Sequence, residues 1–324
     1  MKLTMVEAIR DGLQVALQRD EQTVVLGEDV GKNGGVFRAT EGLWEEFGDH
    51  RVIDTPLSEA GIIGASIGMA LNGMKPIAEM QFLTFLYPAF EQVISHVARL
   101  RTRIQSAYPS SLVIRAPYGG GIRAPELHCD STETYFVHTP GLQVVVPATP
   151  KEAKGLLLAA IESPDPVLFM EPMKIYRTTK EEVPEGYYTT PLHQAQVLQE
   201  GTDVTVIAWG AMVPLVQQAS KVATEKGISC EVLNLRSLYP IDEETIIRSV
   251  QKTGRVVVVH EAPRTAGLAA ELFALIQEKA FYHLEAPMVR VTSPDVPVPM
   301  FALEDHFRPD LQKIVLGLEQ AIKG

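Results

Sequence analysis

The chain is poor in the features that mark several common classes of protein. Only two of its 324 residues are cysteines. Cys129 and Cys230 lie far apart and form no metal-binding pattern, which favours a reducing intracellular setting. No apolar run approaches the ~20 residues that a membrane span needs. Basic residues are also scarce. The 29 Lys and Arg against 40 Asp and Glu give a net charge of −11, so neither nucleic acid nor a membrane surface is an expected partner.

Several catalytic signatures are missing as well. The sequence has no GxGxxG, GxxxxGK(S/T) or HExxH pattern. These absences argue against nicotinamide-dinucleotide binding, P-loop ATP hydrolysis and zinc proteolysis. The first residues are typical of a helix whose capping box pairs Thr4 with Glu7. This helix leaves no room for a signal peptide, and we expect a cytoplasmic protein of bacterial or archaeal type.

What is present is a regular alternation of strand-like and helix-like runs. Strands rich in Val, Ile and Leu are expected at 23–29, 51–55, 75–80, 111–117, 142–149 and 166–171. Helices are expected at 59–73, 84–105 and 151–162. This alternation predicts an α/β fold, a doubly wound and mostly parallel sheet covered by helices on both faces.

A polar stretch with scattered prolines and tyrosines interrupts the alternation at 171–201, after which strands and helices resume. We therefore place a first α/β domain at 1–185, a linker at 186–200 and a smaller second α/β domain at 201–324.

The segment Asp54–Gly64, DTPLSEAGIIG, places a single carboxylate where a strand passes into an apolar helix. Pro56 fixes the turn, and Ser58 is the expected N-cap. A helix that is apolar all round must be buried, so Glu59 is expected in a low-dielectric place where desolvation raises its pKa, as a proton-sharing group requires. The alternative is that Glu59 merely favours the helix N-terminus through the macrodipole.

Three other candidate places also follow predicted strands, where open α/β sheets bind their ligands. Glu28 and Asp29 stand in a glycine-containing loop after the first strand. Gln81 and Phe85 follow another predicted strand. They offer an amide and an aromatic ring, which suit the binding of a planar heterocycle. The fourth place combines the glycines at 119–121 with His128, which Asp130 and Ser131 could hold in one tautomer. Each has a plain structural reading: a turn, a core aromatic or a surface histidine.

Four blocks of the sequence resemble a known family. LGEDVGKNGGVFRATEGL, RVIDTPLSEAGIIGASIGMALNGMKPIAEMQF, PELHCDS and DPVLFMEP are similar to the β subunit of thiamine-diphosphate-dependent 2-oxo acid dehydrogenases, the E1 component of the pyruvate and branched-chain complexes. The resemblance covers essentially the whole chain. It implies a pyrimidine-binding domain, a transketolase C-terminal-like domain and an α2β2 tetramer.

The resemblance also implies roles for individual residues. Glu59 takes the position of the carboxylate that shares a proton with the aminopyrimidine of thiamine diphosphate. Glu28 is a second carboxylate near that ring, and His128 faces the substrate and assists acyl transfer to the lipoyl group. The residues implied to line the pyrimidine are Leu57, Gln81 and Phe85.

Metal ions are implied too. The family holds Mg²⁺ through a GDG motif that is missing here, since Gly48-Asp49 is followed by His50, so the resemblance assigns Mg²⁺ to the α subunit. Some members bind K⁺ through backbone carbonyls, at positions that correspond to Leu112, Ala160, Ile161, Ser163 and Asp165.

The implied activity is oxidative decarboxylation of a 2-oxo acid, with transfer of the acyl group to a lipoyl group of E2. PELHCDS favours pyruvate, while branched-chain 2-oxo acid and acetoin dehydrogenases are alternatives. Another class of function is a non-catalytic subunit that docks the enzyme to E2, because an acidic chain suits a basic peripheral domain. A nicotinamide dehydrogenase is disfavoured by the missing GxGxxG.

Overall fold

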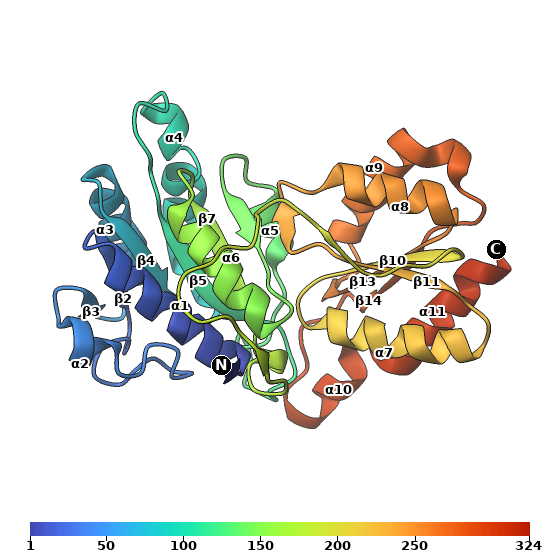
Figure 1. The fold of residues 1–324 in the computed structure, drawn as a ribbon, viewed down its shortest axis with the longest axis horizontal. Helices are drawn as coiled ribbons and strands as arrows, with labels where there is room; N and C mark the ends of the chain where they lie inside the picture. Colours follow the sequence, from blue (N-terminus) through green and yellow to red (C-terminus); the bar gives the residue numbers. More distant parts are fainter. The chain divides into compact units, whose positions relative to one another are not determined.

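The computed structural model describes all residues from 1 to 324. The chain forms two compact units (Figure 1). The first comprises Met1–Tyr118 and Tyr135–Leu192, and the second comprises Gly119–Thr134 and His193–Gly324. Each unit has its own sheet with helices packed against it, and the strands are mostly parallel, which confirms the predicted α/β class. The predicted domain limits at 185 and 201 stay a prediction.

The sheet of the first unit is made of the six strands that the sequence predicted. Its order is β6-β7-β5-β4-β2-β3, and all these neighbours are parallel. The strands are β2 (Thr23–Gly27), β3 (Val52–Asp54), β4 (Lys75–Glu79), β5 (Val113–Tyr118), β6 (Gln143–Val145) and β7 (Val167–Pro172). Most of their residues are buried, so helices cover both faces of the sheet.

The longer helices of this unit begin where the sequence indicates. The side chain of Thr4 accepts a hydrogen bond from the N–H of Glu7, whose carboxylate in turn accepts from the N–H of Thr4, so the predicted capping box is confirmed. These helices are α1 (Met5–Arg19), α3 (Glu59–Leu71) and α6 (Pro150–Glu162). The shorter elements are β1 (Lys2–Leu3), which pairs with β8 (Glu181–Glu182), and α2 (Leu43–Phe47) and η3 (Met173–Ile175). Helix α5 (Glu133–Val137) begins with two residues of the second unit and continues in the first.

The single helix predicted at 84–105 is wrong. The structure has a 3₁₀ helix, η1 (Leu83–Ala89), a π-helical segment, η2 (Gln92–Val97), and a short α4 (Leu100–Arg103) instead. Pro88 lies inside η1. Proline has no N–H to donate and clashes with the preceding turn, so a regular α-helix cannot run through this position.

The prediction that α3 is buried all round is also wrong. Ile62 and Ile63 are buried, but Gly61, Gly68 and Leu71 are exposed. Hydrophobicity alone does not distinguish a core helix from one whose apolar face lies at the surface of its own chain. The exposed apolar face of α3 is the kind of surface that interaction sites present.

The second unit is a five-stranded sheet in the order β14-β13-β10-β11-β9, parallel except for β9 at the edge. Helices α7 and α11 lie on one face of it, and α8 and α9 lie on the other (Figure 1). The strands are β9 (Gln196–Gln199), β10 (Val204–Ala208), β11 (Cys230–Asn234), β13 (Val256–Pro263) and β14 (Val289–Ser293). The helices are α7 (Met212–Glu225), α8 (Glu243–Thr253), α9 (Leu268–Ala280) and α11 (Leu311–Lys323).

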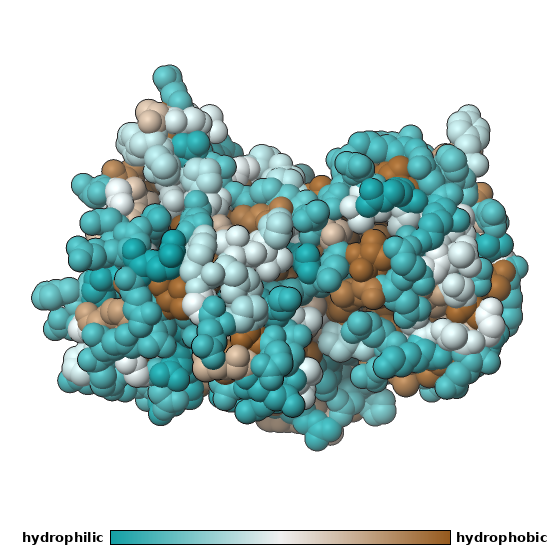
Figure 2. Space-filling view, in the orientation of Figure 1, coloured by the Kyte–Doolittle hydropathy of each residue, from teal (hydrophilic) through white to brown (hydrophobic).

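The sequence missed several elements of this unit. β9 falls inside the predicted linker, and α11 was not predicted although Asp310 caps it by accepting from the N–H of Lys313. The other short elements are β12 (Ser237–Tyr239), η4 (Phe281–His283), η5 (Phe301–Leu303) and α10 (Glu304–Phe307). Hydrophilic residues cover most of the face shown in Figure 2, in keeping with a chain that is 21% charged. None of the helices has the length and apolar character needed to span a bilayer.

A buried ionic network joins the carboxyl ends of β4, β5 and β7. Nη1 of Arg115 lies 2.6 Å from Oε2 of Glu79, and Nε of Arg115 lies 2.7 Å from Oε1 of Glu171. The hydroxyl of Tyr176 donates to the carboxylate of Glu171. Burial raises the pKa of Glu79, and Arg115, which is 1% exposed, opposes this rise. The guanidinium of β5 therefore holds together β4 and β7, whose carboxylates carry like charges.

Replacing Arg115 by methionine should destabilise the first unit severely. Arg115→Met leaves two buried carboxylates without their cation, which is expected to lower the free energy of unfolding by about 3 to 5 kcal/mol. Urea unfolding followed by circular dichroism measures this loss. The matched control is Arg103→Met, because Arg103 is exposed. Equal midpoints for the two variants would contradict the structural importance of the network.

Candidate functional site

The candidate site lies at the carboxyl edge of the first sheet, where three neighbouring strands end. Glu28 follows β2 directly, Asp54 is the last residue of β3, and Gln81 comes two residues after β4. Glu59 is the first residue of α3, which follows β3. Since β3, β2 and β4 are adjacent in the sheet, their ends present these side chains along one edge.

Glu28 and Glu59 form an acidic pair at this edge. Burial raises the pKa of Glu28, and the negative charges of Glu59 and Asp29 raise it further. The low-dielectric surroundings predicted for Glu59 are not provided by this chain, which leaves the residue half-buried. Ser58 is at the N-cap position as expected, but its side chain makes no capping hydrogen bond. A carboxyl group such as Glu28, whose ionisation a neighbouring carboxylate disfavours, is suited to holding a proton beside a ligand.

The backbone around Glu28 is held by the end of β3. The N–H of Gly31 donates to Oδ1 of Asp54 at 2.6 Å, and a Cβ added at Gly31 would lie 2.5 Å from Oδ2 of the same residue. The N–H of Gly35 donates to the carbonyl of Asp29 at 2.7 Å. The glycines of this loop thus allow a close approach that a side chain would prevent.

The residues predicted to line a planar ring are placed by η1 and its flanks. Phe85 is half-buried, and its ring centroid lies 5.2 Å from that of Phe82 in an edge-to-face arrangement. Gln81 is half-buried, whereas Leu57 is 78% exposed. An amide, an aromatic ring and an exposed leucine are therefore available on this unit, and their contact with a cofactor stays a prediction.

His128 lies in the segment Gly119–Thr134, which belongs to the second unit. Its Nδ1 is 2.8 Å from the carbonyl oxygen of Glu126. A backbone carbonyl two residues earlier thus contacts the ring, and the expectation that Asp130 and Ser131 hold it stays a prediction. A carbonyl only accepts, so Nδ1 carries the proton of the neutral ring and Nε2 is the basic nitrogen.

The second unit buries carboxylates that the sequence did not single out. Glu133, Glu261 and Glu304 are all buried. Burial raises the pKa of Glu133 to about 7, and the neighbouring Glu261 contributes to the rise. Hydrogen bonds from the backbone of Glu133 itself and from the Trp209 side chain oppose this rise of the pKa. Acidic residues beside aromatic or glycine-rich stretches are too common in sequences for these three to have been found without the fold.

Comparisons with known proteins define the class first. The family model for the transketolase pyrimidine-binding domain matches residues 1–179, and that for the transketolase C-terminal domain matches residues 193–314. A solved split-gene transketolase, described as an inactive β4 tetramer, shares the fold with a TM-score of 0.82 at 24% identity, covering 100% of this chain and 99% of its own. The protein is therefore of the transketolase-like class.

Curated relatives narrow the family. The β subunit of the pyruvate dehydrogenase E1 component from Acholeplasma laidlawii is 48% identical over 99% of this chain and 98% of its own. The corresponding subunit from Bacillus subtilis (strain 168) is 48% identical over 97% of each. The mitochondrial 2-oxoisovalerate dehydrogenase subunit β from Dictyostelium discoideum is 50% identical over 95% of this chain and 84% of its own. The chain belongs to the family of β subunits of thiamine-diphosphate-dependent 2-oxo acid dehydrogenase E1 components, a class of oxidoreductases.

The pKa of Glu133 makes the stability of the second unit depend on pH. The folded-state pKa of about 7 lies above the ordinary value of 4.5, so the folded state binds the proton more tightly than the unfolded state does. Stability should therefore fall as the pH rises from about 4.5 to 7, by up to about 3 kcal/mol. Glu133→Gln removes this dependence. In urea unfolding, the free energy of unfolding of the variant relative to that of the native protein should therefore be higher at pH 8 than at pH 5.

The control for this experiment is Glu126→Gln, which neutralises an exposed carboxylate of the same segment. Its free energy of unfolding should differ from that of the native protein by the same amount at pH 5 and at pH 8. If Glu133→Gln also differs from the native protein by the same amount at both pH values, then Glu133 does not cause the pH dependence of stability.

Proposed function

We propose that the chain is the β subunit of a pyruvate dehydrogenase, active together with an α subunit in an α2β2 tetramer. The proposed reaction is the oxidative decarboxylation of pyruvate with transfer of the acetyl group to a lipoyl group of E2. The observation that carries the proposal is Glu59 beside Glu28 at the carboxyl edge of the first sheet, in a chain whose near full-length relatives include E1 β subunits of pyruvate dehydrogenase.

In this proposal the chain binds and polarises the pyrimidine half of thiamine diphosphate. When bound, the cofactor supplies a nucleophilic carbon and an electron sink for decarboxylation. Glu59 would hold a proton against the ring nitrogen. Glu28, whose pKa is raised, would bind a proton more readily and so limit the negative charge beside Glu59. Phe85 would stack on the ring, and the residues beside it would be Gln81 and Leu57.

His128 is proposed to act in acyl transfer. The hydrogen bond from Nδ1 to the carbonyl of Glu126 leaves Nε2 as the basic nitrogen of the neutral ring. The lipoyl group would accept the acyl group as a disulfide, whose S–S bond breaks and takes up the two electrons of the oxidation. Nε2 would relay a proton to the lipoyl sulfur that is released, which then becomes a thiol, and this is general acid–base assistance.

The diphosphate end of the cofactor does not fit this chain. No group of three or more His, Cys, Asp and Glu residues could hold a metal ion, and the Gly48–His50 turn exposes 75% of the Asp49 side chain. We therefore assign Mg²⁺ and the diphosphate to the α subunit. The exposed Leu57 and the open apolar face of α3 support a partner chain at this side of the first unit.

Four of the five carbonyls implied to bind potassium accept hydrogen bonds within the chain. The carbonyl of Ser163 accepts from the hydroxyl of Ser111 at 2.7 Å, and the carbonyl of Asp165 accepts from the hydroxyl of Ser163 at 2.9 Å. The carbonyls of Leu112 and Ala160 accept N–H groups of the chain. Each of these oxygens keeps a second lone pair, so the potassium site stays a prediction. No role in the reaction is assigned to K⁺.

Two alternatives remain for the substrate and one for the function. A branched-chain relative is as similar as the pyruvate enzymes, so branched-chain 2-oxo acids compete with pyruvate, as does acetoin. The other class is a non-catalytic subunit that docks E2 domains through its acidic surface, in keeping with a net charge of −11.

Glu59→Gln tests the proton-sharing role. Co-expressed with its α partner, the variant should lose about 100-fold or more of its decarboxylation rate, because an amide cannot share the proton. The rate is measured with pyruvate and an artificial electron acceptor. Glu45→Gln is the control, since Glu45 is an exposed first-turn carboxylate on α2 and tests the macrodipole effect alone. Full activity in Glu59→Gln would favour the docking subunit.

A substrate panel tests the acyl preference. The assembled enzyme should turn over pyruvate with a kcat/KM at least about tenfold above that for 3-methyl-2-oxobutanoate, because its two extra methyl groups are each discriminated by about 1 kcal/mol or more in a tight pocket. Acetoin, which has a hydroxyethyl group in place of the carboxylate, should also be a poorer substrate than pyruvate. Comparable or inverted values would reassign the substrate while leaving the family unchanged.

A further inference from the structure

The segment that carries His128 has almost no regular secondary structure to hold it. Between β5 and α5 the chain runs from Gly119 to Asp130 through turns and bends. Arg123 and Leu127 have positive φ values of 54° and 63°, which are costly for residues other than glycine. Such a loop keeps one conformation only if contacts outside it fix the backbone.

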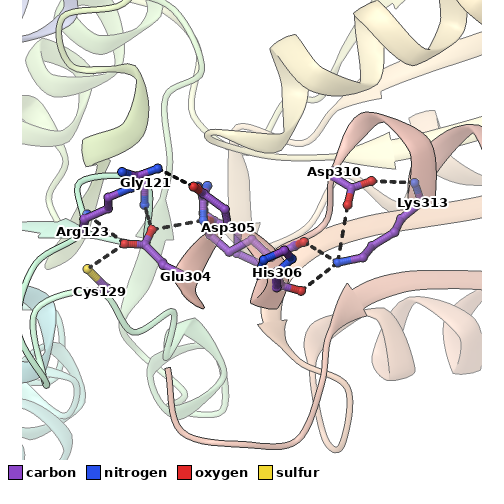
Figure 3. Close-up of polar contacts among 10 residues, drawn as sticks. Gly121, Arg123, Cys129, Glu304, Asp305, His306, Asp310 and Lys313 are labelled. Carbon is purple, nitrogen blue, oxygen red and sulfur yellow. Dashed lines mark hydrogen bonds and ion pairs between the residues drawn. The ribbon is translucent and has the colours of Figure 1, made fainter. Parts of the chain in front are cut away.

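A single buried carboxylate supplies those contacts (Figure 3). Glu304, the first residue of α10, is 1% exposed. Its Oε2 accepts the N–H of Arg123 at 2.8 Å, and its Oε1 accepts the N–H of Gly121. Two backbone N–H groups thus bond one ionised group, and hydrogen bonds to a charge are roughly twice as strong as neutral ones.

The glycine beside these bonds is required by the same contact. A Cβ added at Gly120 would lie 2.6 Å from Oε1 of Glu304 and 2.7 Å from Cδ of Arg308. The glycine run that the sequence singled out therefore has a steric reason: it lets the loop approach the carboxylate.

The carboxylate is itself held in place from behind. Nε of Arg308 lies 3.2 Å from Oε1 of Glu304, and Nη1 of Arg308 lies 3.3 Å from Oε1 of Glu261 on β13. Nζ of Lys313 donates to the carbonyls of His306 and Arg308 at 3.0 and 2.8 Å, which ties α10 to the start of α11 (Figure 3). Glu304 is thus fixed to regular elements of the second unit.

The loop also meets Glu304 near His128. Sγ of Cys129 lies 4.0 Å from Oε2 of Glu304. Burial raises the pKa of Cys129 to about 11, so the thiol stays protonated and points a weak donor at the carboxylate. The contacts of Glu304 therefore bracket His128, with Gly121 and Arg123 on one side and Cys129 on the other.

We propose that Glu304 is a positioning residue for His128: it accepts two backbone N–H groups of the loop before the histidine, contacts the thiol of the residue after it, and so fixes where the imidazole stands during acyl transfer. The proposal rests on the role of His128 in the proposed function. It assigns to the C-terminal segment a part in catalysis without contact to substrate or cofactor.

The clamp itself is tested by hydrogen exchange on the assembled α2β2 enzyme. Glu304→Gln keeps the shape of the side chain but replaces one acceptor oxygen by a donor. The amides of 119–131 should then exchange about tenfold or more faster, the change expected from losing a hydrogen bond to a charged group. Gly120→Ala disturbs the clamp from the loop side and should give the same pattern. Unchanged exchange in both variants would overturn the clamp.

The kinetic test separates acyl transfer from decarboxylation. Glu304→Gln should lower kcat for reductive acylation of a lipoyl domain about tenfold, because a displaced base transfers protons poorly. Decarboxylation with an artificial acceptor, and KM for pyruvate, should stay unchanged. Asp305→Asn is the matched control, since Asp305 pairs at 2.6 Å with the exposed side chain of Arg123 instead of its backbone. Equal losses in both assays would indicate general destabilisation and overturn the proposal.

A double variant distinguishes failure of this proposal from failure of the proposed function. If Glu304 acts through His128, then Glu304→Gln in a His128→Ala background should add no further loss of acylation. Additive losses would overturn the positioning role. A His128→Ala variant with full acylation would instead overturn the role of His128 and with it this inference, while the exchange experiment still reports whether the clamp exists.

Discussion

The first unit depends on one cation buried among carboxylates. Arg115 binds Glu171 through two nitrogens and Glu79 through a third, and all three side chains are nearly inaccessible to water. A buried charge is tolerated only when it is paired, so each member requires the others. Glu79 ends β4, and Gln81 with the η1 segment follows directly. The edge of the sheet that carries the candidate site is thereby fixed by electrostatics, and hydrophobic packing alone would not fix the direction in which β4 ends.

The parts of the fold that could be predicted are those encoded by local patterns. Buried parallel strands need continuous β-branched runs, and α1 carries its own capping box. Both kinds of element can therefore be predicted from the local sequence. The failures arise from long-range effects. Arg115 meets partners 36 and 56 residues away, and Glu304 meets Arg123 across 181 residues. Pro88 breaks the helix predicted at 84–105, a local signal that the apolar periodicity concealed.

The candidate site was found by position more than by environment. The rule that ligands bind beyond the carboxyl ends of strands located Glu28, Glu59 and Gln81 correctly along one edge. Their electrostatics did not follow from the sequence, because burial of Glu59 was inferred from an apolar helix whose exposed face this chain does not cover. The raised pKa of Glu28 depends on how near its neighbours lie, which only the fold determines.

The two units hold their functional groups in opposite ways. At the first, side chains project from a rigid sheet edge, so precision comes from the strands and the ionic network beneath them. In the second, His128 stands on an irregular loop, and precision has to come from backbone hydrogen bonds to a carboxylate far along the chain. A loop held mainly through its N–H groups depends on few of its side chains, chiefly Gly120 and Cys129, so the other side chains are available for substrate and partner recognition. Such an arrangement allows the loop sequence to vary with the acyl group while Glu304 and the glycines keep the histidine in place.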